Sequence, residues 1–214
     1  MKHSGLYLIA LLLAGPASGA DAVAVGLFSQ GNLDGWQTEK FDGVTQYRLT
    51  EDNGIKYLLA VSRDAASGLY REMEVDLERT PILQWSWKVE NRIDSPDEHS
   101  KAGDDYPARI YVVFSGGLAF WRTRAINYVW SSTQEAGSTW PNAYTANARM
   151  IAVRGVDAPL HTWLSESRDV RADYRRLFGE PPGVVAAIAL MTDTDNTGQE
   201  ARAWYGDIRF VSAK

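Results

Sequence analysis

The sequence predicts an all-β fold: a single antiparallel β-sandwich of about ten strands with one short helix. Three observations predict it. Apolar and polar residues alternate with a period of two in many segments, as in strands that bury one face. Turn-forming residues separate these segments at short intervals. Helical spacing is clear in one segment, 169–178.

The strands are predicted in chain order. The first covers 24–28, and the next two, around 47–49 and 57–61, flank Asn53-Gly54. This dipeptide readily supplies the two positive φ angles of a tight hairpin turn. Strands with one apolar face follow at 69–77 and 83–89. Further strands are predicted at 108–114, 126–130, 148–153, 161–165, 184–191 and 203–210.

The helix at 169–178 interrupts the later strands. Val170, Tyr174 and Phe178 recur at helical spacing. Asp169 is placed to cap the N-terminus of the helix, and Gly179 ends it. We expect the helix to lie across an edge or end of a sheet. Neither a repeat nor a long linker divides the chain, so the sequence predicts one domain over 21–214.

Composition and charge restrict the function. The 214 residues are 45% hydrophobic and 23% charged, enough for one substantial core. The 22 basic and 27 acidic residues give a net charge of −5, which argues against a nucleic-acid partner. Because the chain has no cysteine, disulfides, zinc–thiolate sites and cysteine nucleophiles are excluded.

Residues 1–20 have the pattern of a secretory signal peptide. Lys2 and His3 precede an apolar run at 6–14, and small residues lead up to Ala20. The run is shorter than the roughly 20 residues that span a bilayer. We therefore expect cleavage after Ala20 and a periplasmic or secreted protein. No later segment approaches a transmembrane length, so integral membrane association is not expected.

An acidic segment, 192–198, follows a predicted buried strand and contains Asp193, Asp195 and Asn196. Alternate side chains converge when such a loop curls, and oxygen ligands suit a hard cation such as calcium. In the alternative interpretation, the same carboxylates accept hydrogen bonds from loop amides in turns. The sequence leaves both interpretations open.

A second polar group surrounds Arg109. This residue shares a strand face with Tyr111 and Val113, so we expect it to be partly buried and paired with a carboxylate. Asp104 or Asp105 is nearest in sequence. The three charged residues either form a structural ion pair or contact the hydroxyls or charges of a ligand.

Aromatic residues are frequent in the middle third of the chain. Trp140 and Tyr144 lie in a predicted loop, where flat rings can stack on the C–H face of a sugar. Trp140 is the tryptophan most expected to be exposed, followed by Trp121. The alternative is that these tryptophans belong to the core, where most tryptophan is buried.

Five motifs occur together over nearly the whole chain after residue 20: Trp85-Ser86-Trp87, Gly103-Asp104-Asp105 with Arg109, 168–179, 192–197 and Tyr205-Gly206-Asp207-Ile208. In these the chain resembles a family of uncharacterised exported bacterial proteins, domain-of-unknown-function family 3047 (DUF3047). The resemblance implies no known activity.

More distantly, the chain resembles the jelly-roll sandwiches of carbohydrate-binding modules and galactose-binding-like domains. It rests on Gly35-Trp36 near the start and Asp207-Ile208 near the end. In such modules an aspartate of the terminal strand often helps to hold a structural calcium ion. The likeness thus implies that Asp207 joins Asp193 and Asp195 as a metal candidate.

These observations predict an exported, non-catalytic protein that binds a glycan or related envelope polymer. Trp140 and Tyr144 would stack on the ligand, and Asp104, Asp105 and Arg109 would hydrogen-bond it. The first alternative is a polysaccharide hydrolase or lyase, whose carboxylates would line one cleft. It would use Asp193, Asp195, Asp104 and His161. The second is an envelope assembly partner, recognisable by an exposed apolar patch or open sheet edge.

Overall fold

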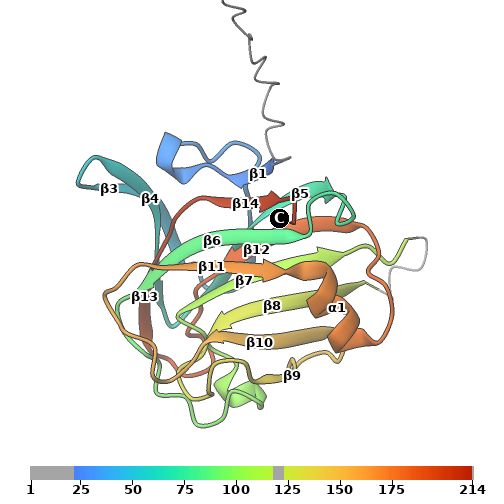
Figure 1. Ribbon diagram of the computed structural model, residues 1–214. Helices are drawn as coiled ribbons and strands as arrows, with labels where there is room; N and C mark the ends of the chain where they lie inside the picture. Colours follow the sequence, from blue (N-terminus) through green and yellow to red (C-terminus); the bar gives the residue numbers. More distant parts are fainter. Residues whose placement is uncertain (1–21, 118–122, 214) are drawn as a thin grey trace, which may run out of the picture.

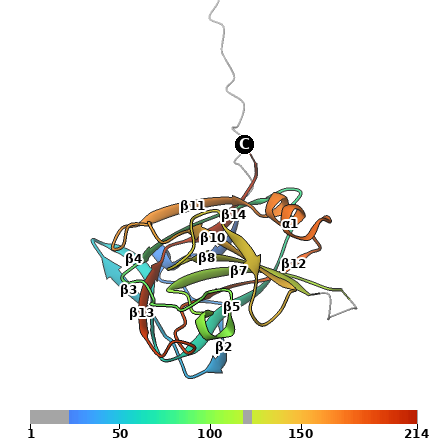
Figure 2. The ribbon, with the colours of Figure 1, turned by 90° about the horizontal axis from the view of Figure 1, so that it is seen from below.

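The computed structural model describes residues 22–117 and 123–213. In this part of the chain, two seven-stranded sheets pack face to face, with the α-helix α1 at one end (Figure 1). Figure 2 shows β11 and β14 of one sheet along one side and β2 and β5 of the other along the opposite side. The predicted β-sandwich is confirmed. The predicted signal peptide and Trp121 lie outside the described residues.

The first sheet has the order β1-β14-β6-β13-β4-β3, and β11 also pairs with β6. All of its pairings are antiparallel. Its strands are β1 (Ala22–Gly26), β3 (Gln46–Asp52), β4 (Ile55–Arg63), β6 (Ile82–Val89), β11 (Leu164–Asp169), β13 (Glu200–Tyr205) and β14 (Ile208–Val211).

The second sheet has the order β2-β5-β12-β7-β8-β10-β9. One pairing departs from the antiparallel prediction, because β10 runs parallel to β8 and β9 takes the outer edge beside β10. The strands are β2 (Gln37–Asp42), β5 (Ala66–Val75), β7 (Ala108–Phe114), β8 (Arg124–Trp130), β9 (Thr139–Pro141), β10 (Ala148–Arg154) and β12 (Val185–Met191).

The predicted hairpin is confirmed. Asn53 and Gly54 have φ angles of 51° and 78°, and they join β3 to β4 in the antiparallel register that a two-residue turn sets. The predicted strand 203–210 is instead two strands, β13 and β14. The break falls at Gly206-Asp207, where the Asp207 carboxylate accepts from Ser29 of η1 at 2.8 and 2.6 Å.

A second boundary also differs from prediction. The strand expected at 161–165 begins later, at Leu164. His161 lies in a turn with a φ of 57°, and its N–H donates to the Val89 carbonyl at 2.8 Å. Two strands were not predicted. All six residues of β2 are exposed, so it has no buried face to produce alternation, and β9 has only three residues.

The core lies between the two sheets and is rich in aromatic rings. Trp87, Trp130 and Tyr128 are fully buried there. From β7, the side chains of Ala108, Ile110, Val112 and Phe114 enter this core. Because side chains alternate along a strand, Arg109, Tyr111 and Val113 face away from it. The outer face of the second sheet therefore carries these residues.

Helix α1 (Val170–Phe178) closes one end of the sandwich, as predicted. Its first turn is capped by Asp169, whose side chain accepts from the Ala172 N–H at 2.9 Å. Tyr174 packs on Phe114 of the second sheet, with ring centroids 4.5 Å apart. Two short 3₁₀ helices, η1 (Phe28–Gln30) and η2 (Lys101–Gly103), lie in connections. In the described residues no helix is long and apolar enough to cross a membrane.

Candidate functional site

The outer face of the second sheet presents side chains in rows across neighbouring strands. Tyr111 of β7 lies opposite Asn127 of β8 and Ala189 of β12, and Ala189 lies opposite Tyr70 of β5. The four side chains therefore share one face. Because the side chain of Ala189 is small, the surface has a depression over β12 between Tyr70 and Tyr111.

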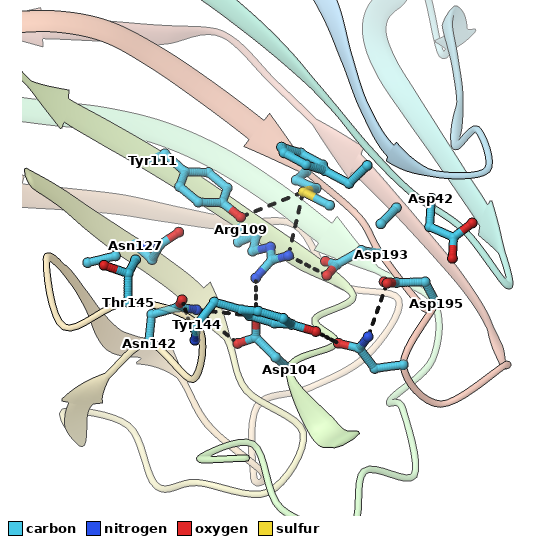
Figure 3. A pocket seen from close by; sticks show the side chains of 15 residues that line it. Asp42, Asp104, Arg109, Tyr111, Asn127, Asn142, Tyr144, Thr145, Asp193 and Asp195 are labelled. Atoms are coloured by element: carbon cyan, nitrogen blue, oxygen red, sulfur yellow. Dashed lines mark hydrogen bonds and ion pairs between the residues drawn. The ribbon is translucent and has the colours of Figure 1, made fainter. Parts of the chain in front are cut away.

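A cavity of about 490 Å³ lies at one end of this face (Figure 3). Three loops enclose it: the segment before β7, the β9–β10 connection and the segment after β12. Its lining residues are Phe41, Asp42, Ala66, Asp104, Arg109, Tyr111, Asn127, Asn142, Tyr144, Thr145, Ala148, Met191, Asp193, Asp195 and Asn196.

Two further hollows continue from this cavity along the same face. A hollow of about 310 Å³ shares Phe41, Tyr111 and Met191 with the cavity. A third, of about 790 Å³, shares Tyr70 and Ala187 with the second hollow. We call the three together the groove. It runs from the acidic cavity across β12 toward the far ends of β5 and β12.

Arg109 is the central charge of the cavity. It is only 5% exposed, and its guanidinium forms ion pairs with Asp193 and, at 3.6 Å, with Asp104. Of the two neighbouring carboxylates considered as partners, Asp104 and Asp105, Asp104 forms the ion pair, whereas Asp193 was not predicted as a partner. Burial alone would lower the pKa of Arg109, but the nearby Asp193, Tyr111 and Asp104 raise it above its usual value.

The carboxyl groups of the cavity have pKa values above their usual range. Burial raises the pKa of Asp193 and of Asp104, although the positive charge of Arg109 opposes the shift. Burial and the neighbouring Asp105 raise the pKa of Asp195. These carboxyl groups are therefore poorly solvated as anions, and a bound cation would favour their charged forms.

Asp105 holds the loop after β12 in place by accepting hydrogen bonds from its backbone. It is fully buried and accepts the N–H groups of Asn196 and Thr197 at 3.2 and 2.7 Å. The turn interpretation expected Asp193 and Asp195 to accept from the loop amides, whereas the acceptor of these two amides is Asp105 and Asp193 pairs with Arg109. Asp105, Asp193 and Asp195 each offer an oxygen within 4.8 Å of the others. Within residues 22–117 and 123–213, this is the carboxylate group that could hold a metal ion.

Asp207 lies outside that group. Its carboxylate accepts the N–H and hydroxyl of Ser29 at 2.8 and 2.6 Å, which ties η1 to the β13–β14 connection. The expected grouping of Asp207 with Asp193 and Asp195 is therefore wrong, because Asp207 is bound to Ser29 in the β13–β14 connection, whereas Asp193 and Asp195 follow β12. Calcium binding by Asp193 and Asp195 stays a prediction, with Asp105 as the third carboxylate.

The two predicted stacking residues differ in exposure. Trp140 is only 4% exposed. It packs with Tyr106 and Met150 and stacks on His99 with ring centroids 5.1 Å apart. The expectation that it is exposed is wrong, because residues before β7 and Met150 of β10 cover it. Tyr144 is 55% exposed and lines the cavity, where its hydroxyl lies 3.3 Å from Asn196 Oδ1.

Three contributors were missed in the sequence. Asn142 donates to both oxygens of Asp104 at 3.1 and 3.2 Å. Asn127 is 1% exposed, and neither of its side-chain polar atoms has a partner in the described part of the chain. Phe41 is 69% exposed at the end of β2. The signal for Asn127 was an amide within the apolar strand 126–130.

The predicted catalytic residues are only partly brought together. Asp104, Asp193 and Asp195 line the same cavity, as the hydrolase or lyase hypothesis requires. His161 is not among the lining residues, and its backbone N–H is bound to Val89 of the first sheet. No role in this site remains for His161.

Residues 34–209 match the family model described as "Protein of unknown function (DUF3047)". No curated protein matches the chain. Among solved structures, a cellulase derived from Cel12A of Rhodothermus marinus aligns with 11% identity and a TM-score of 0.51, over 90% of this chain and 96% of the cellulase. At this identity the likeness shows the fold alone, a β-sandwich.

Two other solved structures align at lower TM-scores. The CBM22-1 xylan-binding domain of Paenibacillus barcinonensis Xyn10C has 11% identity and a TM-score of 0.43, over 92% of this chain and 99% of the domain. The enzymatically active domain of bacteriophage CBA120 tailspike protein 4 has 11% identity and a TM-score of 0.46 over 88% of this chain. The chain covers 21% of that tailspike chain.

Proposed function

The chain belongs to the DUF3047 family of proteins of unknown function, and from its site we propose that it binds a glycan or related envelope polymer in the groove. The observation that carries this proposal is the succession of three hollows on one sheet face, each sharing residues with the next. Such a succession suits an extended chain of similar units better than one compact small molecule.

The side chains of the groove fit the surface of a sugar. Phe41 and Tyr144 are exposed by 69% and 55%, and Tyr70 and Tyr111 line the middle hollow. Aromatic rings offer an apolar face to sugar C–H groups, while tyrosine hydroxyls remain available for hydrogen bonds. The small Ala187 and Ala189 leave room on the central strand between these rings.

The location expected from the sequence agrees with this proposal. Export, predicted from residues 1–20, would bring the groove into contact with envelope polymers in the periplasm or outside the cell. The fold also supports it, because a cellulase shares the β-sandwich. A shared fold alone does not assign a function, so the proposal depends on the groove.

Hydrolysis of the bound polymer is a second candidate. It is favoured by three carboxyl groups with raised pKa values in one cavity, Asp104, Asp193 and Asp195. A general acid needs a raised pKa in order to hold its proton near neutral pH. The test is an assay for reducing ends released from a bound glycan. Release by the wild-type protein that is lost in Asp195→Asn would show hydrolysis in place of binding alone.

A glycan array followed by affinity electrophoresis tests the proposed binding. Phe41→Ala and Tyr144→Ala are each expected to weaken binding about three- to tenfold, the loss of one stacking contact of roughly 0.5–1.5 kcal/mol. Ile55→Ala is the matched control, since Ile55 is 49% exposed on the first sheet. A blank array, or equal weakening in the control, would contradict binding in the groove.

A further inference from the structure

The cavity at one end of the groove carries an excess of negative charge. Four of its lining side chains are carboxylates, Asp42, Asp104, Asp193 and Asp195, and its one cationic lining residue is Arg109. Arg109 is already engaged with Asp193 and Asp104. A ligand that enters this cavity therefore meets uncompensated acidic groups, and an anionic unit such as a uronate would be repelled.

A buried amide points independently to a ligand. Asn127 lines the cavity and is 1% exposed, yet its Oδ1 and Nδ2 both lack a hydrogen-bond partner among the described residues. Buried polar groups are nearly always hydrogen-bonded, and an unsatisfied one costs about 1–3 kcal/mol. A group in the cavity that both donates and accepts, such as a sugar hydroxyl, would satisfy it.

The two features lie on different sides of the cavity. Figure 3 shows Asn127 on one side of Arg109, with Asp193 and Asp195 on the other. Asp193 Oδ1 is also buried and without a partner in the described part of the chain. The volume of about 490 Å³ falls within the range of roughly 300–1,000 Å³ usual for small-ligand pockets. A cavity of this volume has room for one sugar unit.

We propose that this cavity is the subsite for an amino-sugar unit of the polymer, with its ammonium group at Asp193 and Asp195 and a hydroxyl group on Asn127. The inference rests on the proposed glycan binding and narrows it to a polymer that carries free amino groups. A neutral sugar would use Asn127 alone. The ammonium group of an amino sugar would in addition place a positive charge beside the acidic groups.

Calorimetric titration with three β-1,4-linked tetrasaccharides tests this inference, because they differ only at carbon 2. They are the tetramers of glucose, N-acetylglucosamine and glucosamine, which carry a hydroxyl, a neutral acetamido and an ammonium group. The titrations contain a chelator, so that no divalent ion competes for the carboxylates. The glucosamine tetramer is expected to bind about tenfold more tightly than the other two, the effect of one charge pair.

Variants separate the cavity from general charge attraction. Asp195→Asn is expected to reduce the preference for the glucosamine tetramer to less than about threefold. Asp42→Asn, at the exposed end of β2, removes another acidic group of the cavity. It should also lower the preference, and it replaces Asp195→Asn as the test if that variant folds poorly. Asp157→Asn is the matched control, because Asp157 is exposed and does not line the cavity. It should keep the full preference.

Asn127→Leu tests the other side of the cavity. It is expected to weaken all three tetrasaccharides by a similar factor, since each carries hydroxyl groups, without lowering thermal stability. A purely structural role of Asn127 would instead lower stability and leave binding unchanged.

The possible outcomes separate this inference from the proposed function. Equal affinity for the three tetrasaccharides, no binding of any of them, or equal loss of preference in Asp157→Asn would overturn the amino-sugar subsite. If the glycan array still reports binding, the proposed function stands. A blank array removes both.

Discussion

Arg109 is the residue on which the cavity depends most. It is buried against Asp193, and removing one member of a buried ion pair leaves the other charge without compensation. Arg109→Met is therefore expected to lower the free energy of unfolding by about 3–5 kcal/mol. Urea denaturation measures it. The double variant Arg109→Met/Asp193→Leu should recover most of the loss, and a double variant as unstable as the single one would contradict this account.

Glu98 is expected to make the stability of the protein fall as pH rises. It is fully buried, and burial raises the pKa of its carboxyl above 4.5 although Ser131, Ser132 and Thr133 donate to it. The folded state then holds a proton that the unfolded state releases. Its contribution to stability is complete below pH 4.5 and is lost as pH rises through the raised value.

Glu98→Gln tests this dependence, because glutamine resembles the protonated carboxyl and cannot ionise. The wild-type protein is expected to lose stability from pH 4.5 upward, and the variant to lose less over the same interval. Chemical denaturation at a series of pH values measures both slopes. Identical slopes would show that Glu98 does not hold the proton.

Single carboxylate substitutions also test the predicted calcium site of Asp105, Asp193 and Asp195. A calcium ion bound only by the folded chain raises stability by about 2.7 kcal/mol at a hundredfold excess over its Kd. Thermal unfolding in a calcium titration should show the rise in the wild-type protein and in Asp207→Asn, whose carboxylate serves Ser29. Asp195→Asn should abolish it. A rise that persists in Asp195→Asn would place the ion elsewhere.

At the scale of elements, the cap of α1 is the most local feature. Asp169 accepts from the Ala172 N–H and satisfies one of the amides that a helix start leaves open. Asp169→Ala is expected to lower the free energy of unfolding by about 1 kcal/mol. Urea denaturation measures it, with Asp157→Ala as the control on an exposed aspartate. Equal stability of wild type and Asp169→Ala would refute the capping role.

Elements with a strong local signal could be predicted from the sequence. The hairpin at Asn53-Gly54, strand β7 at Ala108–Phe114 and the capped helix all depend on neighbouring residues. Strand β2 could not, because it is exposed along its length and pairs only as an edge. The break between β13 and β14 falls at Gly206-Asp207, where Asp207 binds Ser29, which is distant in sequence.

The site was predicted in part for the same reason. Asp104 is near Arg109 in sequence, so their pairing could be expected, whereas Asp193 reaches Arg109 only through the pairing of β12 with β7. Trp140 was expected to be exposed because loop composition says nothing about which residues cover a loop. Its burial depends on packing against Tyr106 and Met150 from other segments.

At the scale of the whole molecule, the two outer faces of the sandwich differ. The outer face of the second sheet carries the groove and its acidic cavity. On the first sheet, aromatic rings are already occupied by one another and by lysine: Tyr57 lies 4.3 Å from Trp163, and Lys88 lies over Trp204. We therefore expect the ligand to bind the outer face of the second sheet.

Nuclear magnetic resonance during titration with the glucosamine tetrasaccharide tests this placement most directly. We expect chemical-shift changes at Tyr111, Asn127 and Ala189 on the outer face of the second sheet, and at Tyr144, which lines the cavity. Asp157→Asn should show the same pattern. Shift changes centred on Trp163 and Trp204 of the opposite face would contradict this placement, and no shift change at saturating concentration would contradict the amino-sugar subsite.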